Sequence, residues 1–141
     1  MKTITKLNSQ ETLLKYGISP SIHRMTIMNY MLQHRTHPTA DEIYSHLHGD
    51  IPTLSKTTIY NTLKLLVAKG AIQEITIDEK NTRYDAEIEP HSHFKCNVCG
   101  HIYDVPSPKI GGITDKSIYK ISEVQVYYRG ICTICRSLLM H

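Results

Sequence analysis

The four cysteines constrain the fold of this chain more than any other feature of its sequence. They fall in two Cys-x-x-Cys pairs, Cys96 with Cys99 and Cys132 with Cys135, and no cysteine is left over. Two such pairs supply the four sulfur ligands of a closed tetrahedral site. The spacing therefore predicts a structural zinc ion that ties the two pairs together. The alternatives are two redox dithiols or buried free thiols.

A second set of potential ligands begins just before the first cysteine pair. It combines carboxylates, two histidines two residues apart and a final aspartate: Asp85, Glu87, Glu89, His91, His93 and Asp104. His91 and His93 point to the same side of an extended segment, because side chains alternate along a strand. Histidine nitrogens and carboxylate oxygens form a mixed site suited to iron, manganese or zinc. The alternative is a pair of surface histidines on an edge strand.

Length and composition indicate an ordinary globular protein. The chain has 141 residues, a length that is enough for one domain or two small ones. Its residues are 40% hydrophobic and 21% charged, as in an ordinary globular protein. The N-terminal segment has no apolar signal-peptide core, and no apolar run approaches the length of a membrane span. We therefore expect a cytoplasmic protein, in which paired cysteines favour metal over disulfides. The formal charge of +3 gives no strong indication of a polyanionic partner.

Four helices are predicted in the first half of the chain, over residues 8–16, 21–34, 39–48 and 55–69. Thr39 and Glu42 have the spacing of a capping box, which begins the third helix. Ser55 is a potential N-cap of the fourth helix, and Gly70 is a stop signal. In the second helix, apolar residues recur at helical spacing: Ile22, Met25, Ile27 or Met28, Met31 and Leu32.

The rest of the chain is predicted to contain mostly strands. Residues 71–77 alternate as a strand and residues 82–87 return after a turn, so three helices and a hairpin form a winged helix-turn-helix pattern. Further strands are expected over 92–96, 101–105 and 123–129, with a weak helix near 112–119 and another from about Thr133. We expect an α+β protein with a winged-helix domain over 1–84, a hinge over 85–90 and a small α/β domain over 91–141.

The fourth predicted helix has the pattern of a DNA recognition helix, with an apolar side that seats it and a polar side for base edges. Tyr60 offers its ring to a thymine methyl and its hydroxyl to a phosphate, while Thr57 and Asn61 can hydrogen-bond bases. Phosphate contacts are expected from Lys56, Lys64 and Arg24, and Lys80 in the turn of the hairpin is a further candidate. Double-stranded DNA is therefore the expected partner. The alternative is the solvated face of an ordinary helical domain.

Four segments of the sequence resemble the ferric uptake regulator family: His37-Pro-Thr-Ala-Asp-Glu-Ile-Tyr44, Thr58-Ile-Tyr60-Asn-Thr-Leu63, Arg83-Tyr-Asp85 and His91-Ser-His93-Phe-Lys-Cys96-Asn-Val-Cys99-Gly100. The resemblance runs in order across nearly the whole chain. It implies a homodimeric, metal-dependent transcriptional repressor that binds an inverted-repeat operator. It also implies that residues 91–141 form the dimerisation domain and that the four cysteines hold structural Zn²⁺.

The resemblance also implies a branch of that family. The peroxide-sensing branch uses three histidines and two aspartates as a regulatory Fe²⁺ or Mn²⁺ site, and five positions match: His37, Asp85, His91, His93 and Asp104. In that branch peroxide oxidises a ligand histidine, here His37 or His91. The iron-uptake branch typically has glutamate at the position of Asp104. An iron- or zinc-responsive uptake repressor is the alternative.

Two segments depart from the family pattern. The segment Arg-x-Thr-x-Gln-Arg reads Ser19-Pro-Ser21-Ile-His23-Arg24, so a usual DNA-contacting arginine is absent. The stretch 105–122 is short and contains Gly111-Gly112, which is poor for a dimerisation helix.

Two other classes of protein could contain such residues. The first is an enzyme in which zinc activates a water molecule. The sequence has no His-Glu-x-x-His segment, so we expect neither catalysis nor a small organic substrate. A zinc-ribbon interaction module would account for the cysteines and leave the histidines and aspartates unused.

Overall fold

The computed structural model describes residues 8–89, 91–108, 118–121 and 123–139. The chain divides into two compact units, Met1–Ile88 and Glu89–His141. Within the described ranges, no helix is long and apolar enough to cross a membrane.

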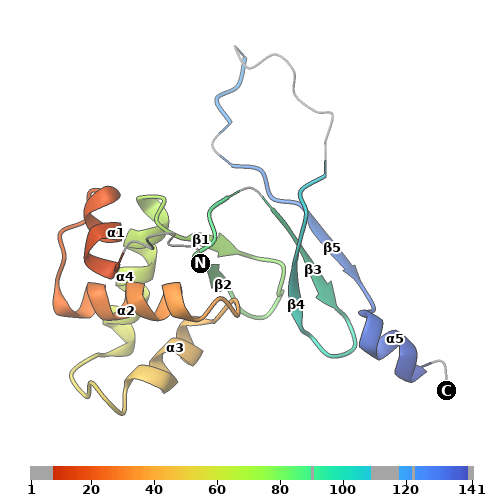
Figure 1. Cartoon of the computed structure of the whole chain (residues 1–141), viewed down its shortest axis with the longest axis horizontal. Coiled ribbons are helices and arrows are strands. Elements are labelled where there is room, and N and C mark those ends of the chain that lie inside the picture. Colours follow the sequence, from red (N-terminus) through yellow and green to blue (C-terminus); the bar gives the residue numbers. More distant parts are fainter. Residues whose placement is uncertain (1–7, 90, 109–117, 122, 140–141) are drawn as a thin grey trace, which may run out of the picture. The chain divides into compact units, whose positions relative to one another are not determined.

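The first unit contains four helices and a two-stranded sheet: α1 (Ser9–Lys15), α2 (Ile22–Gln33), α3 (Ala40–Leu47), α4 (Lys56–Ala68), β1 (Gln73–Ile75) and β2 (Arg83–Asp85) (Figure 1). Each helix begins after an N-cap whose side chain accepts a backbone N–H three residues on: Asn8, Ser21, Thr39 and Ser55. Gly17 and Gly70 follow α1 and α4 with φ of +72° and +84°, a conformation that glycine adopts without strain. Local chemistry therefore sets the helix ends where the sequence predicts them.

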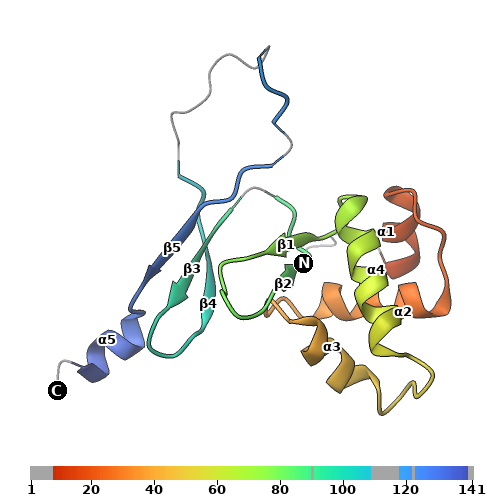
Figure 2. The ribbon, with the colours of Figure 1, turned by 180° about the vertical axis from the view of Figure 1, so that it is seen from behind.

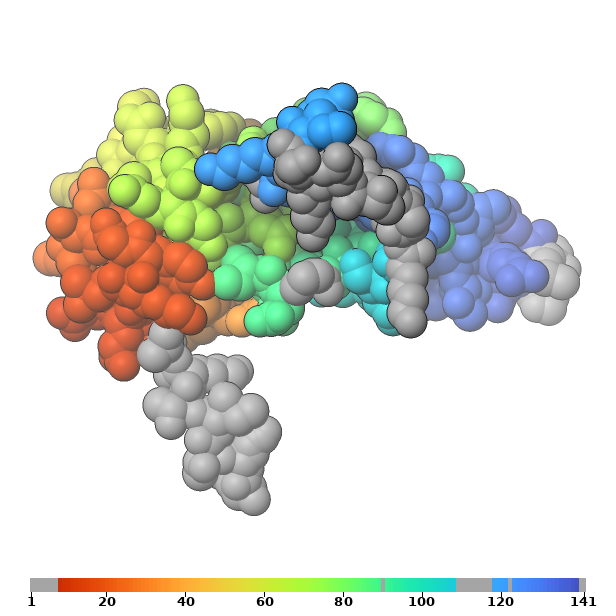
Figure 3. All heavy atoms as spheres, turned by 90° about the horizontal axis from the view of Figure 1, so that it is seen from above, coloured from red at the N-terminus to blue at the C-terminus, as the bar shows by residue number. Residues whose placement is uncertain are grey.

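The helices of the first unit enclose its hydrophobic core, and their atoms form a continuous surface, red to yellow-green in Figure 3. The buried face of α2 consists of Ile27, Met28, Tyr30 and Met31. The prediction that Ile22 belongs to this face is wrong, because Ile22 is the first residue of the helix and is 72% exposed. On α4 the buried residues are Ile59, Thr62, Leu63 and Leu66.

The predicted hairpin is present but shorter than its sequence pattern, since a strand extends only where its backbone is paired. β1 and β2 are antiparallel, with Gln73 opposite Asp85 and Ile75 opposite Arg83. Thr39 forms a further bridge with Arg83, and the Tyr84 N–H donates to the Pro38 carbonyl at 3.0 Å. These contacts hold β2 beside the connection between α2 and α3 (Figure 2).

The second unit is a three-stranded sheet and a helix: β3 (Ser92–Cys96), β4 (Ile102–Val105), β5 (Tyr127–Gly130) and α5 (Thr133–Leu139). The strand order is β4-β3-β5, with β4 antiparallel and β5 parallel to β3. β5 begins at Tyr127 and not at residue 123 as predicted. The helix predicted near 112–119 falls mainly on residues 109–117, which lie outside the described residues, and Ile118 and Tyr119 are not helical.

Candidate metal centres

The second unit brings the four cysteines together. β3 ends at Cys96 and the turn after it carries Cys99, while Cys132 directly precedes α5 and Cys135 lies in its first turn. Because β5 runs parallel to β3, with Gly130 opposite Cys96, both strands end at the same edge of the sheet. The four sulfur atoms all lie within 4.8 Å of one another.

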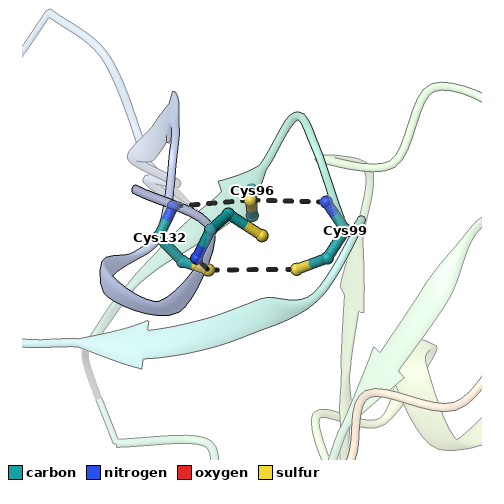
Figure 4. A group of neighbouring side chains, drawn as sticks. Cys96, Cys99 and Cys132 are labelled. Atoms are coloured by element: carbon teal, nitrogen blue, oxygen red, sulfur yellow. Dashed lines mark hydrogen bonds between the residues drawn. The ribbon is translucent and has the colours of Figure 1, made fainter. Parts of the chain in front are cut away.

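The spacing of these sulfur atoms fits zinc. Four sulfurs placed tetrahedrally at about 2.3 Å from one zinc ion lie about 3.8 Å from each other. The sulfurs of Cys99 and Cys132 lie 3.9 Å apart, as the lower dashed line of Figure 4 marks. Cys99 is exposed, whereas the other three cysteines are buried.

Backbone N–H groups point at the sulfur of Cys96. Cys132 and Cys99 donate to it at 3.4 and 3.5 Å (Figure 4), and Val98 donates to it at 3.4 Å. The bonds from Cys132 and Cys99 are the main reason that the pKa of Cys96 falls to about 6. The pKa of Cys135 rises to about 12 through its hydrogen bond with Cys132 and through burial. Zinc binds thiolates, so its binding here releases protons and strengthens as the pH rises.

Tyr103 is a contact of this cluster that the sequence analysis did not identify. Its hydrogen bond with the Cys132 side chain, together with burial, raises the pKa of Tyr103 to about 12. Tyr103 lies opposite Phe94 in the sheet, and both residues pack against the buried cysteines. Strand alternation could have predicted that Tyr103 faces the cysteines, because it is next to Asp104 and must point to the other side of the sheet.

The other side of the same sheet carries His91 and His93. His93 pairs with Asp104 across β3 and β4, and the Asp104 Oδ1 atom lies 3.3 Å from His91 Nε2 and 3.4 Å from His93 Nε2. The two rings meet edge to face with centroids 4.5 Å apart. The structure thus brings three of the five predicted regulatory ligands into one cluster.

The His91 ring is oriented by a backbone group. Its Nδ1 atom lies 2.7 Å from the Glu89 carbonyl oxygen. A carbonyl oxygen only accepts, so Nδ1 carries the proton, and a neutral ring then turns the lone pair of Nε2 toward the carboxylate of Asp104. The Nε2 lone pair and the carboxylate oxygen, 3.3 Å apart, form a pair of donor atoms that one metal ion can join.

The remaining two predicted ligands meet inside the first unit. His37 Nε2 lies 3.6 Å from Asp85 Oδ2, and both side chains are at least 95% buried. The other Asp85 oxygen accepts the Glu87 N–H at 2.8 Å. A buried imidazole beside a buried carboxylate can bind a cation with little reorganisation.

His37 has a strained backbone. Its φ of +57° is the one positive value at a non-glycine position among the described residues. Such a conformation costs about 1–3 kcal/mol in a residue of this kind and persists only where neighbouring contacts enforce it. Sequence patterns gave no sign of this conformation.

The predicted recognition face of α4 is exposed in the structure. Thr57, Tyr60, Asn61 and Lys64 are all exposed on the side opposite the buried residues, with Tyr60 at 45%. Asn61 and Arg24 line one groove of about 250 Å³ between the start of α2 and α4. The ammonium of Lys56 lies 3.8 Å from Asp41 Oδ1 and over the Tyr44 ring.

A winged helix followed by a small unit with a four-cysteine cluster and a histidine–aspartate cluster defines a DNA-binding regulator with metal sites. The ferric uptake regulator family model matches residues 15–129, and the chain belongs to this family. The resemblance noted from the sequence is thereby confirmed.

Two relatives have names that refer to peroxide. The chain is 32% identical over 129 residues to the peroxide-responsive repressor PerR of Staphylococcus aureus, covering 89% of this chain and 87% of that protein. It is 31% identical to the peroxide operon regulator of Bacillus subtilis, covering 89% of each chain. Both names describe regulators of genes, and neither describes an enzyme.

Solved structures agree with the predicted α+β fold class, which is confirmed. One match is PerR from Streptococcus pyogenes, whose structure is described as explaining peroxide sensing and gene regulation. Its TM-score is 0.52 and its sequence identity is 30%, over 96% of this chain and 98% of that one. The Helicobacter pylori ferric uptake regulator Fur matches with a TM-score of 0.72 over 96% and 97% of the two chains. At 21% identity the second likeness concerns the fold alone.

Proposed function

We propose that this protein is a metal-dependent transcriptional repressor that senses peroxide through oxidation of a ligand histidine. The observation that carries this proposal is the donor set of Asp104, an aspartate and not a glutamate, at 3.3 and 3.4 Å from two histidine nitrogens. The relatives named for a peroxide response support it. In this proposal residues 1–84 bind DNA, residues 85–90 are a hinge, and residues 91–141 bind metal and dimerise.

The two kinds of donor set divide the metal roles. The cysteines Cys96, Cys99, Cys132 and Cys135 hold structural Zn²⁺, because four thiolates leave no open coordination position. The nitrogen and oxygen donors His37, Asp85, His91, His93 and Asp104 hold regulatory Fe²⁺ or Mn²⁺. When bound, Fe²⁺ supplies the electrons that reduce peroxide next to the ligand rings of His37 and His91.

The regulatory ligands come from both units, and this origin explains how metal controls DNA binding. His37 and Asp85 belong to the first unit, and His91, His93 and Asp104 to the second. One ion shared by all five limits the arrangements that residues 85–90 allow. A dimer on DNA must place two recognition helices in major grooves about 34 Å apart, so restricting the hinge raises the population that is competent to bind.

The second unit also offers a surface for a homodimer. β5 is at an edge of the described sheet, where its outer backbone groups can pair with another strand. Large apolar side chains are exposed on and around β5 and α5: Val124, Tyr128, Ile131, Ile134, Leu138 and Leu139. An apolar surface of this kind on a unit with a small core is typical of an interface between subunits. A symmetric dimer matches an inverted-repeat operator.

The peroxide response is tested by comparing two metal forms of the protein. We expect the Fe²⁺ form to lose operator binding after brief exposure to low peroxide, with one oxygen atom added to His37 or His91. The Mn²⁺ form is expected to bind the operator and to resist peroxide, because manganese supports the same donors without the same oxidation chemistry. Gel-shift titration measures the binding, and peptide mass spectrometry locates the added oxygen.

Two outcomes of this comparison contradict the proposal. An iron-loaded protein whose histidines stay unmodified while a cysteine is oxidised is a thiol sensor. An iron-loaded protein that keeps operator binding in peroxide is an iron- or zinc-responsive uptake repressor of the same family.

Substitutions on α4 test the DNA-binding face. Tyr60→Ala is expected to weaken specific binding by about 1–3 kcal/mol, the range for a good base contact. Lys64→Ala is expected to weaken binding to all sequences and to reduce the slope of log affinity against log salt by about one. Fluorescence anisotropy at several salt concentrations measures both effects. Lys15→Ala on α1 is the control, and parent-like binding by both α4 variants would assign the interface elsewhere.

A further inference from the structure

The left-handed backbone of His37 needs an explanation from its surroundings. His37 has φ +57° and precedes Pro38, whose ring restricts the residue before it. Positive φ is uncommon at any non-glycine position, although histidine adopts it more often than most residues do. Yet this conformation is the one in which the imidazole lies 3.6 Å from Asp85. Whatever holds the backbone of His37 therefore also decides where its ring points.

The guanidinium of Arg83 contacts the backbone of His37 directly. Its Nη1 atom donates to the His37 carbonyl oxygen at 3.0 Å, while its Nε atom donates to Asp78 Oδ2 at 3.1 Å. A longer contact of 3.5 Å reaches Glu42 Oε1. The Arg83 side chain is only 22% exposed, so these bonds are shielded from competing water. Asp78 thus orients the Arg83 guanidinium through Nε, and Nη1 of the same group forms a hydrogen bond with the His37 carbonyl.

Asp78 is itself held in place. It lies in the turn between β1 and β2, where the Lys80 N–H donates to its Oδ1 atom at 3.0 Å. Burial raises the pKa of Asp78, but the hydrogen bonds from Lys80 and Arg83 outweigh burial and lower it. The carboxylate is therefore charged when it orients Arg83.

We propose that Arg83 is a positioning residue for the regulatory metal: it holds His37 in the left-handed conformation that presents the imidazole next to Asp85. This inference rests on the proposed role of His37 as a metal ligand. Without Arg83 the His37 carbonyl loses the hydrogen bond from Nη1, the backbone relaxes to negative φ, and the ring moves away from Asp85. Lysine is a poor replacement for arginine here, since its single nitrogen atom cannot occupy the positions of both Nε and Nη1, from which Arg83 reaches Asp78 and His37.

The test uses the full chain with its zinc retained and measures Mn²⁺ binding in the absence of DNA. Arg83→Gln and Arg83→Lys are both expected to bind Mn²⁺ about 10–100-fold more weakly, the usual effect of losing a group that orients a metal ligand. Asp78→Asn is expected to cause a smaller loss in the same direction, because Arg83 keeps its bond to His37. The matched control is Arg35→Gln, which removes an exposed ion pair with Glu87 in the same unit.

A second readout needs no metal. In the zinc-containing protein without Mn²⁺, the one-bond Cα–Hα coupling and the Cα shift of residue 37 report the sign of its φ. Both are expected to move toward values for negative φ in Arg83→Gln and to stay unchanged in Arg35→Gln. Thermal unfolding identifies any variant that has lost its fold. If the Arg83 variants do not fold, Asp78→Asn is compared with the parent in both measurements.

Three results would overturn the inference. Parent-like Mn²⁺ affinity in Arg83→Gln would do so, as would a loss of DNA affinity with unchanged metal affinity, which would make Arg83 a phosphate contact. Unchanged couplings at residue 37 would show that other contacts hold its backbone. Failure of the proposed function has a different signature: His37→Ala would then bind Mn²⁺ like the parent, while the couplings in Arg83→Gln would still decide whether Arg83 holds His37.

Discussion

Cys96→Ser is expected to lose the zinc ion and to unfold the second unit while the helices of the first unit remain. The second unit has a small core, in which the buried residues of the described cluster are Cys96, Cys132 and Cys135 with Phe94 and Tyr103 packed against them. Zinc binding to such a site contributes about 10–16 kcal/mol at neutral pH, and this free energy is folding free energy. Few apolar contacts are available to replace it.

Cys96 is the most sensitive of the four positions. Its side chain is fully buried, and its sulfur accepts three backbone N–H groups from both ends of the unit. Serine has a shorter bond to its oxygen and a far more basic anion, so it replaces neither the zinc bond nor these contacts. Zinc per chain, circular dichroism and size-exclusion chromatography measure the loss. The control is Ser137→Ala on the exposed side of α5, and a stable zinc-free dimer of Cys96→Ser would contradict the assignment.

Asp104→Glu is expected to keep metal-dependent DNA binding and to lose most of the peroxide response. Asp104 lies opposite His93 on the paired strand, and one of its oxygen atoms already lies within 3.4 Å of both histidine nitrogens. A glutamate extends the side chain by one carbon–carbon bond, about 1.5 Å, so its carboxylate must fold back or approach from another direction. Either change alters the position of the ligand without removing it.

The measurement is operator binding by the Fe²⁺ form of each protein before and after low peroxide, together with the oxygen content of the peptides that contain His37 and His91. Asp50→Glu, an exposed aspartate in the loop after α3, is the control for one added methylene. A variant at position 104 that is as sensitive to peroxide as the parent would show that carboxylate length does not select the response.

Local chemistry made much of the first unit predictable. Helix starts at Ser21, Thr39 and Ser55 follow from side chains that accept N–H groups within one turn, and such bonds need no distant partner. The strands were less well placed: β1 and β5 are shorter than their patterns, because pairing decides where a strand ends. Ile22 had a helical period but lies on the exposed side of α2.

The sequence by itself determined the ligand types, the helix boundaries and the family, since each depends on residue identity at short or repeated spacing. Only the tertiary structure decided how these ligands are brought together. Parallel pairing of β5 with β3 joins cysteine pairs more than thirty residues apart, and antiparallel pairing of β4 sets Asp104 against His93. Neither the left-handed conformation of His37 nor its hydrogen bond with Arg83 could be predicted from the sequence. Each arises from contacts between segments distant in the chain, which no local pattern encodes.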